Sequence, residues 1–448
     1  MKRIALIGRS LRHSYSPQIH AALTDKYSYE LLEILPEDVE DVLRDEQYAG
    51  FNVTIPYKVD ALMYCDELSE VAQVIGSVNT VVRRPDGTLY GDNTDAAGFA
   101  AMLASSGLKV RGEKVIILGS GGSSRAVRYV LEQAGVRETV LVSRNGRNAL
   151  DVTKPINNPP RHSANYKGLD RHSDAVMIVN TTPVGMFPHT GFAPVNLKKT
   201  FFDAGVSNIK GVLDLIYNPS RTRLLIEAAQ LGLTAVGGLI MLVEQARAAA
   251  EQFADAPLTA EVLPLIQQTR ENIILVGMPG VGKSSIGQSL ARQLNRRFVD
   301  TDYLIKKDTG KEITDLFAEE GEVAFRRRES EMTASVGKQS GLVVATGGGV
   351  VTRPHNYNHL HQNGTIFWLQ RPIEKLETKN RPLSQGDLQA LYNAREPLYT
   401  QFADHVVIGS ARVRDTAERI AHAWQSQDWG DLTNPQHAEA ANEENIGS

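Results

Sequence analysis

Short, uninterrupted apolar runs alternate along the chain with longer segments in which apolar residues recur every three or four positions. The runs at 4–7, 115–118, 176–179 and 273–276 are each followed at once by a polar or glycine-rich turn. Runs that are apolar throughout are typical of parallel strands, because helices cover both faces of a parallel sheet. The pattern therefore predicts an α/β protein with largely parallel sheets.

One of these runs enters a glycine-rich segment, 277–285, which reads Gly-Met-Pro-Gly-Val-Gly-Lys-Ser-Ser. Gly280 and Gly282 allow backbone N–H groups to curl around a polyphosphate at the N-terminus of the following helix. Lys283 can reach the terminal phosphates, and the hydroxyl of Ser284, which Ser285 follows, can ligate Mg²⁺. An ordinary glycine-rich turn is the alternative, but strand, loop, Lys-Ser and helix arrive in the order that a nucleotide-binding loop requires. We therefore expect ATP and Mg²⁺ as its ligands.

The position of this loop predicts the domain organisation, because such loops usually open their domain and this one begins only at Gly277 of 448 residues. A chain of this length is expected to form two or three domains. We expect an α/β substrate domain with a Rossmann-type domain, followed by a P-loop domain like that of nucleoside-monophosphate kinases. The predicted segments are a substrate domain at 1–110 to which a helix at 237–254 returns, a Rossmann domain at 111–236, a linker at 255–270, the P-loop domain at 271–426 and a disordered tail at 427–448.

The composition changes this picture little. Hydrophobic residues make up 42% of the chain and charged residues 22%, with a net charge of −4, so we expect neither a nucleic-acid nor a membrane surface. No apolar run is long enough for a membrane span, and the N-terminus lacks a secretory apolar segment. The single cysteine, Cys65, excludes an internal disulfide and favours a reduced, cytoplasmic setting, in which it is a small core residue.

Polar side chains that suit a small hydroxylated ligand gather in residues 1–110. Ser14 and Ser16 precede or begin a predicted helix, where capping and ligand binding remain equal alternatives. Lys58 is predicted in the first turn of a helix, where the dipole disfavours it, so it is either a solvated lysine or an acid/base group. Two Asn-Thr pairs, at 79–80 and 93–94, flank a predicted hairpin, and Asp95 is predicted at the start of the next helix.

These stretches together resemble shikimate dehydrogenase. The matching motifs, in order, are Ser-x-Ser-Pro, Asn-Val-Thr-x-Pro-x-Lys, Val-Asn-Thr and Asn-Thr-Asp. The resemblance implies that Lys58 and Asp95 form the catalytic pair. It implies a substrate site made of Ser14, Ser16, Thr54, Asn79 and Asp95. Two later loops, 214–219 and 237–246, resemble the same family, which adds Tyr217 and Gln245 to the substrate and Leu215 and Gly238 to the cofactor.

A dinucleotide site is predicted between these motifs. A glycine-rich turn follows the strand at 114–118. It departs from the usual G-x-G-x-x-G pattern in having Ser124 at the sixth position. Its predicted cofactor-binding residues are Gly119, Gly121, Gly122 and Ser123. The next strand ends in Ser143 and Arg144. NAD-binding folds usually place an acidic residue there, whereas an arginine suits the 2′-phosphate of NADP. We therefore expect NADP(H), against the alternative of a solvated arginine.

The segment after the phosphate loop carries a second set of motifs. Asp300 and Asp302 are two residues apart in a predicted strand, so they should share a face and suit Mg²⁺ and a substrate hydroxyl. A helix then carries Arg326, and three glycines follow a strand at 347–349. Later, Arg381 lies in a polar segment that can close over the nucleotide, and Arg395 opens a late helix.

This set resembles shikimate kinase over about residues 271–426. The resemblance implies that Asp302, Arg326, Gly348, Gly349 and Arg395 hold shikimate, with the two arginines on its carboxylate. It assigns Lys283 and Arg381 to phosphate charge, as catalytic groups beside Asp302, and Ser284 and Asp300 to Mg²⁺. The predicted lid around 378–383 is short.

The sequence therefore predicts a bifunctional enzyme that reduces 3-dehydroshikimate with NADPH and then phosphorylates shikimate with MgATP. Two alternatives remain at this point. One is a quinate-type dehydrogenase joined to a kinase for another small polyol. The other is that one half is a non-catalytic module that senses a ligand.

Overall fold

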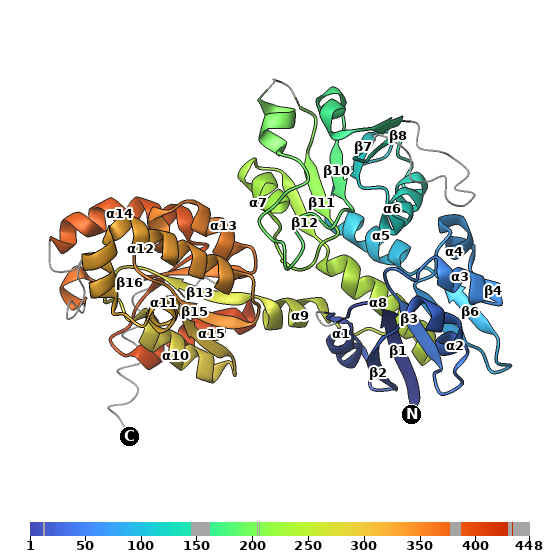
Figure 1. Ribbon diagram of the computed structural model, residues 1–448, viewed down its shortest axis with the longest axis horizontal. Helices are drawn as coiled ribbons and strands as arrows, with labels where there is room; N and C mark the ends of the chain where they lie inside the picture. Colours follow the sequence, from blue (N-terminus) through green and yellow to red (C-terminus); the bar gives the residue numbers. More distant parts are fainter. Residues whose placement is uncertain are drawn as a thin grey trace. The chain divides into compact units, whose positions relative to one another are not determined.

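The computed structural model describes residues 1–11, 14–144, 162–203, 205, 207–376, 387–428 and 432. They divide into two compact units, 1–266 and 267–448 (Figure 1). The first unit holds two sheets and the second holds one. The α/β class predicted from the apolar runs is confirmed.

The first sheet of unit one is mixed, with the strand order β2-β1-β3-β5-β6-β4. Its strands are β1 (Lys2–Gly8), β2 (Tyr27–Glu33), β3 (Gly50–Val53), β4 (Glu67–Leu68), β5 (Thr80–Arg83) and β6 (Leu89–Asp92). Its helices are α1 (Ser16–Leu23), η1 (Pro36–Asp38), α2 (Val39–Arg44), α3 (Asp60–Tyr64) and α4 (Glu70–Ile75). The β5–β6 hairpin predicted between the two Asn-Thr pairs is present, and its strands are antiparallel.

The second sheet of unit one is parallel throughout, in the order β12-β11-β10-β7-β8-β9. Its strands are β7 (Lys114–Leu118), β8 (Glu138–Val142), β9 (His162–Ala164), β10 (Met177–Asn180), β11 (Gly211–Asp214) and β12 (Thr234–Gly237). Its helical segments are α6 (Gly122–Gln133), η3 (Tyr166–His172), η4 (Lys198–Phe202) and α7 (Arg223–Gln230). This is the strand–turn–helix arrangement of a Rossmann-type domain.

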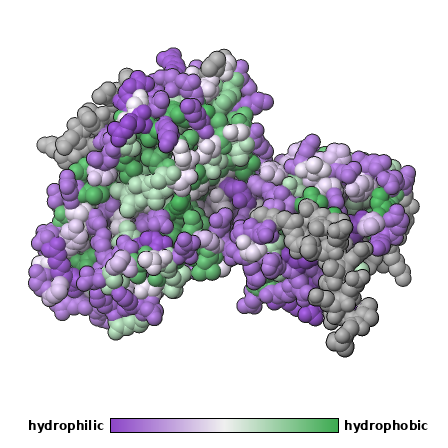
Figure 2. All heavy atoms as spheres, turned by 180° about the vertical axis from the view of Figure 1, so that it is seen from behind, coloured by the Kyte–Doolittle hydropathy of each residue, from purple (hydrophilic) through white to green (hydrophobic). Residues whose placement is uncertain are grey.

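Two helices join the sheets of unit one. α5 (Asp95–Ser105) leads from the first sheet to the second, and α8 (Leu239–Ala254) returns from the second to the first. They pack closely, because a Cβ at Gly98 of α5 would lie 2.5 Å from the carbonyl oxygen of Met241 in α8. Seen from behind, the apolar residues of this unit gather in the band between its two lobes, and the rims are polar (Figure 2).

The segment predicted as a linker is more ordered than its composition suggested. Helix α9 (Leu263–Arg270) forms about two turns within the segment 255–270 that the sequence predicted as a linker. Val262 and Ile266 are buried with residues of α1 and α8 in the core of the first unit. Of the apolar residues of α9, Ile266 is buried, Leu263 packs against the same core and Leu265 is exposed, so the helix shows no long apolar stripe in the sequence. The predicted domain boundaries themselves stay predictions.

The sheet of the second unit is also parallel, in the order β14-β15-β13-β16-β17. Its strands are β13 (Asn272–Val276), β14 (Arg297–Asp300), β15 (Leu342–Ala345), β16 (Gly364–Gln370) and β17 (His405–Ile408). Its helices are α10 (Lys283–Gln293), α11 (Thr301–Thr309), α12 (Ile313–Gly337), η5 (Val350–Thr352), α13 (His355–His361), η6 (Ile373–Lys375), α14 (Leu388–Phe402) and α15 (Val413–Ser426). Gly321, with φ of 81°, interrupts α12.

Of the predicted tail, 427–448, only residues 427, 428 and 432 are described, so the prediction of disorder lies outside the described residues. Over the described ranges, no helix is long and apolar enough to cross a membrane.

Candidate functional sites

The Lys58–Asp95 pair lies where two elements of the first sheet meet. The Lys58 Nζ donates a hydrogen bond of 2.5 Å to Asp95 Oδ2, and their side chains are 18% and 5% exposed. Asp95 begins α5, as predicted, where the helix dipole stabilises a carboxylate. Lys58 lies in a turn two residues before α3, not in the first turn of a helix as the sequence suggested. The ammonium group is therefore placed by the carboxylate and not opposed by a helix dipole.

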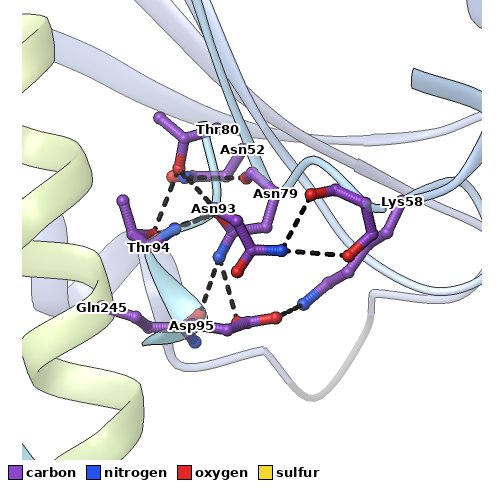
Figure 3. A network of polar contacts seen from close by, with 9 residues as sticks. Asn52, Lys58, Asn79, Thr80, Asn93, Thr94, Asp95 and Gln245 are labelled. Atoms are coloured by element: carbon purple, nitrogen blue, oxygen red, sulfur yellow. Dashed lines mark hydrogen bonds and ion pairs between the residues drawn. The ribbon is translucent and has the colours of Figure 1, made fainter. Parts of the chain in front are cut away.

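Asn79 fixes the orientation of Asp95 (Figure 3). Its Nδ2 donates to Asp95 Oδ1 at 3.0 Å and to Gln245 Oε1 at 3.2 Å. Its Oδ1 accepts from the backbone N–H of Thr94 at 2.7 Å. Asn79 directly precedes β5, Asp95 begins α5 and Gln245 lies in α8. The network therefore connects three separate parts of the chain around the carboxylate of Asp95.

A second layer behind Asn79 was not predicted. Asn52, on β3, donates from Nδ2 to Thr80 Oγ1 at 3.3 Å, and Thr80 Oγ1 donates to Asn79 Oδ1 at 3.1 Å. The Oδ1 of Asn52 accepts from the hydroxyl of Tyr29 at 2.8 Å. Asn52 stands in the Asn-Val-Thr motif, so a polar residue in an otherwise apolar buried strand was the available signal.

The other predicted substrate residues surround the end of β1 and the start of α1. Ser14 Oγ lies 3.1 Å from Ser16 Oγ and accepts from the backbone N–H of Ser16 at 3.2 Å, whereas Ser16 is itself the first residue of α1, after the N-cap residue Tyr15. The capping alternative is therefore wrong for Ser16. The Tyr15 and Tyr217 rings lie 5.1 Å apart, which brings the 214–219 loop to α1. Thr54 follows β3, and its methyl group fills the space next to Gly8, where a Cβ would lie 2.6 Å from it.

The predicted dinucleotide turn follows β7. Gly119 has φ of 103°, a left-handed conformation that favours glycine, and a Cβ there would collide with Thr181 Oγ1 at 2.7 Å. Gly121 is the N-cap of α6, and no atom lies within 4 Å of a Cβ added at Gly121 or Gly122. Ser123 follows in the first turn. Open space at a helix N-terminus suits a pyrophosphate group, so these residues fit a dinucleotide.

Ser124, which departs from the usual glycine pattern, is fully buried. Its hydroxyl donates to the carbonyl oxygen of Gly121 at 2.6 Å. The small side chain thus closes the turn internally and does not occupy the phosphate position.

The ribose end of the predicted cofactor site is only partly described. Ser143 and Arg144 follow β8, and the Arg144 side chain is exposed. Burial raises the pKa of Tyr166, and the charge of Arg144 lowers it in part. Residues 145–161, which contain the rest of the expected adenosine contacts, lie outside the described residues.

The nicotinamide end is predicted at Leu215 and Gly238. A Cβ at Gly238 would lie 2.1 Å from the carbonyl oxygen of Leu215, so only glycine permits this contact. The loop is held by buried Asp214, which accepts hydrogen bonds from Asn180 Nδ2 at 2.9 Å and Thr222 Oγ1 at 2.7 Å. Burial raises the pKa of Asp214 to about 7.

In the second unit, the phosphate loop has the conformation that its glycines predict. Gly277, Gly280 and Gly282 have φ of 143°, 85° and 99°. Lys283 begins α10, and its Nζ donates to the carbonyl oxygens of Gly277 at 2.8 Å and Met278 at 3.0 Å. The lysine therefore folds over the loop in which a polyphosphate would lie, and a phosphate can replace these carbonyl contacts.

The two predicted Mg²⁺ residues are adjacent. Ser284 Oγ donates to Asp300 Oδ2 at 2.6 Å, and exposed Ser285 follows in α10. A hydroxyl and a carboxylate on the rim of a phosphate loop are the oxygen ligands that Mg²⁺ takes together with phosphates and water. Among the residues that the structure describes, no group of three His, Cys, Asp or Glu could hold a metal by itself.

The prediction that Asp300 and Asp302 share a strand face is wrong. β14 ends at Asp300, whose Oδ1 caps α11 by accepting from the backbone N–H groups of Asp302 at 3.0 Å and Tyr303 at 3.2 Å. Asp302 lies in the first turn of that helix. Because the Asp300 side chain accepts from backbone N–H groups of the following helix, the strand and the alternation of its side chains end at this residue. The two carboxylates still lie at one end of the sheet.

Asp302 and Glu329 enclose the glycine-rich segment after β15. A Cβ at Gly347 would lie 2.5 Å from Glu329 Oε1 and 2.7 Å from Asp302 Oδ1. Both of these oxygens are buried and accept no hydrogen bond within the described part of the chain. The Asp302 residue as a whole is only half-buried, whereas the Oδ1 atom of its carboxyl group is buried. Burial, together with the nearby negative charge of Asp300, raises its pKa to about 7.

Arg326 is buried on α12. Its Nη1 donates to Glu329 Oε2 at 2.7 Å, and Nε lies 3.3 Å from Glu322 Oε1. A Cβ at Gly349 would lie 2.1 Å from the guanidinium, so the glycine is needed for the arginine to reach this position. Sequence reasoning missed Glu329, although a carboxylate three residues after an arginine on a helix is a recognisable signal.

Arg395 lies in the middle of α14, not at its start as predicted. Its Nη1 donates to the carbonyl oxygen of Gly348 at 3.3 Å, and the Tyr399 hydroxyl donates to the same oxygen at 2.5 Å. Both Arg326 and Arg395 therefore converge on the glycine segment 347–349. Arg381 and the predicted lid around 378–383 fall outside the described residues.

The fold and the two sites define a Rossmann-type dehydrogenase unit joined to a P-loop kinase unit. Residues 6–81 match the family model of the shikimate dehydrogenase substrate binding domain, and residues 279–425 match that of shikimate kinase. A shikimate dehydrogenase (NADP⁺) of Caldicellulosiruptor bescii is 39% identical over 264 residues, which cover 55% of this chain and 87% of that protein.

Solved structures agree with this result. The chain resembles a Thermus thermophilus shikimate 5-dehydrogenase in complex with NADP(H) and shikimate at 31% identity, with a TM-score of 0.52 over 59% of this chain and 97% of that one. It also resembles a Corynebacterium glutamicum quinate dehydrogenase in complex with NAD at 27% identity, with a TM-score of 0.52 over 58% and 96%. The chain therefore belongs to the shikimate dehydrogenase family and carries a shikimate kinase domain in addition. Both enzyme activities follow from these two domains.

Proposed function

We propose that the first unit reduces 3-dehydroshikimate to shikimate with NADPH and that the second phosphorylates shikimate to shikimate 3-phosphate with MgATP. The observation that supports this proposal is that one chain contains a connected set of polar side chains in each unit. These are the Lys58–Asp95–Asn79 network and the Asp302–Arg326–Arg395 set around the glycines 347–349.

In the reduction, NADPH would supply a hydride to the ketone carbon. Lys58 gives a proton to the oxygen of the same carbonyl, which becomes the C3 hydroxyl of shikimate. Asp95 holds the ammonium group in place, and Asn79 holds Asp95. Ser14, Ser16, Thr54, Tyr217 and Gln245 would bind the remaining hydroxyl and carboxylate groups. The same residues act in the reverse direction if shikimate and NADP⁺ are in excess.

NADP(H) as the cofactor has two supports. Several relatives are named shikimate dehydrogenase (NADP⁺), and Arg144 stands at the end of β8 where a 2′-phosphate would lie. The phosphate turn Gly119–Ser123 and the Leu215–Gly238 contact would hold the two ends of the cofactor.

In the phosphorylation, ATP would supply the phosphoryl group. Asp302 accepts the proton of the attacking hydroxyl, because its carboxyl has a pKa near the working pH and a free, buried oxygen. Arg326 and Arg395 would bind the carboxylate of shikimate. Lys283 and the predicted Arg381 balance the phosphate charge, and Ser284 and Asp300 would hold Mg²⁺.

A single assay tests the whole proposal. The purified protein is incubated with 3-dehydroshikimate, NADPH and MgATP, and the products are separated and identified. Shikimate 3-phosphate is the expected product, and omission of MgATP should stop the reaction at shikimate. Parallel assays with quinate test the quinate dehydrogenase resemblance. Turnover of quinate with NAD⁺ in preference to shikimate with NADP⁺ would contradict the proposed substrate.

A further inference from the structure

Arg371 lies beside the phosphate loop, although no motif in the sequence marks it. It directly follows β16, and β16 pairs in parallel with β13, the strand that leads into the loop. Neighbouring parallel strands have their carboxyl ends at the same edge of the sheet. Arg371 and the first residue of the phosphate loop therefore lie next to each other. A Cβ added at Gly282 would lie 3.8 Å from Arg371 Nη1.

The path of the Arg371 side chain is fixed by the loop after β17. Its Nη2 donates to the carbonyl oxygen of Ser410 at 2.9 Å. A Cβ at Gly409 would lie 3.0 Å from Arg371 Nε and 3.1 Å from Cγ, so the glycine leaves room for the side chain to lie along the backbone. The guanidinium is thereby held between the β17 loop and the phosphate loop.

The charge of Arg371 is not balanced by the protein as far as it is described. Arg326, Arg328 and Arg414 of the same unit each pair with a glutamate. Arg371 is half-buried, and within the described ranges it forms no ion pair and only the hydrogen bond to Ser410. A half-buried cation is costly without a counter-ion, and an anionic ligand in the neighbouring loop would supply one.

We propose that Arg371 binds the α- and β-phosphates of the nucleotide in the phosphate loop. The backbone of such a loop surrounds these phosphates, and its lysine reaches the β- and γ-phosphates. Arg371 approaches the loop at Gly282, whereas Lys283 contacts the carbonyl oxygens of Gly277 and Met278, so the two cations would divide the phosphate charge between them. The proposal rests on nucleotide binding by the second unit, as set out above.

This position predicts an effect on nucleotide binding and not on the chemical step. Arg371 lies near neither Asp302 nor the glycine segment that would hold shikimate in any contact that the structure describes. Loss of one charge-assisted contact should weaken nucleotide binding on the order of 10- to 100-fold. The KM for ATP should rise, whereas kcat and the KM for shikimate should change little.

The experiment compares Arg371→Ala and Arg371→Lys with the unchanged full-length protein, and Arg414→Ala is the matched control. Arg414 is an exposed arginine of the same unit, paired with Glu418. Binding of MgADP and of inorganic tripolyphosphate is measured by calorimetry. All three tryptophans, Trp368, Trp424 and Trp429, lie in the second unit, so tryptophan fluorescence shows separately whether that unit is folded.

We expect Arg371→Ala to weaken MgADP and tripolyphosphate by similar factors, Arg371→Lys to recover part of both, and Arg414→Ala to change neither. Weaker MgADP binding with unchanged tripolyphosphate binding would overturn the proposal, because the side chain would then contact the nucleoside. Unchanged binding of both ligands in folded Arg371→Ala would overturn it as well. If the unchanged protein binds neither ligand, the proposed kinase function fails together with it.

Discussion

Charge at single residues decides the predicted cofactor preference. Arg144 follows β8 where an acidic residue would bind the ribose of NAD, and its guanidinium is exposed. We expect Arg144→Ala to lose one charge-assisted contact with the 2′-phosphate, at a cost on the order of 1.5–3 kcal/mol in transition-state binding of NADPH. The ratio of kcat/KM for NADPH to that for NADH measures it.

Arg137→Ala is the control for this measurement. Arg137 precedes β8, at the other end of the same strand, and its Nε donates to the carbonyl oxygen of Gly112. Its removal should leave the NADPH/NADH ratio unchanged. An equal ratio in Arg144→Ala and the unchanged protein would show that residues between 145 and 161, or others, discriminate the two cofactors.

Asp302 predicts a pH dependence of the kinase. Burial raises the pKa of its carboxyl to about 7, so the group is protonated below that pH and ionised above it. Only the ionised form accepts a proton, and kcat/KM for shikimate, which reports the enzyme before shikimate binds, should therefore rise with pH through about 7 and then level off. Asp302→Asn should lower kcat by a factor of about 10² or more and remove this dependence. A profile that keeps its midpoint in Asp302→Asn would assign the titration to another group.

At the scale of elements, the second layer behind Asn79 makes β3 part of the dehydrogenase site. Asn52 accepts a hydrogen bond from the hydroxyl of Tyr29. It also donates to Thr80, which in turn contacts Asn79 (Figure 3). We expect Asn52→Ala to cost about 1–3 kcal/mol of stability, because it leaves polar partners unsatisfied. Since Asn79 then orients Asp95 less well, kcat for reduction should fall more than the KM for the substrate changes.

Tyr29→Phe separates the two effects in this element. It removes one hydroxyl and leaves the Asn52–Thr80 contact in place, so we expect a smaller loss of both stability and kcat. If Asn52→Ala lowers the melting temperature but leaves kcat unchanged, Asn52 supports the fold alone and does not position the catalytic pair.

The elements also show what the sequence could predict. Apolar runs and glycine turns sufficed for the α/β class and for the strands β1, β7, β10 and β13, since burial on both faces leaves a clear pattern in such strands. The error at Asp300 and Asp302 arose because strand alternation was extended two residues beyond the helix cap Asp300, into the first turn of α11. Glu329 and Arg371 were missed because their roles depend on neighbours from distant strands and glycines, which no local pattern records.

For the whole molecule, we predict that the two activities are separable. Lys58 and Lys283 belong to different units, and each lies in its own network of described contacts. Lys58→Ala should abolish reduction and leave phosphorylation of added shikimate unchanged, and Lys283→Ala should do the reverse. Assays of each half-reaction with both variants test this. Loss of both activities in one folded variant would indicate a single composite site.

The same two variants test whether the chain passes shikimate between its sites without release. Each unit has its own predicted set of substrate-binding groups, so neither needs the other to complete a pocket. Shikimate is small and soluble, and it would diffuse away quickly compared with a typical turnover of about 10 s⁻¹. We therefore predict free diffusion of shikimate between the two sites.

An equimolar mixture of full-length Lys58→Ala and Lys283→Ala chains, at twice the total concentration, offers the same number of working sites on separate molecules. Starting from 3-dehydroshikimate, NADPH and MgATP, the lag before shikimate 3-phosphate appears should equal that of the unchanged protein, and added unlabelled shikimate should dilute a labelled intermediate equally in both. A clearly shorter lag for the unchanged protein, with each half-reaction equally fast in the variants, would show direct transfer.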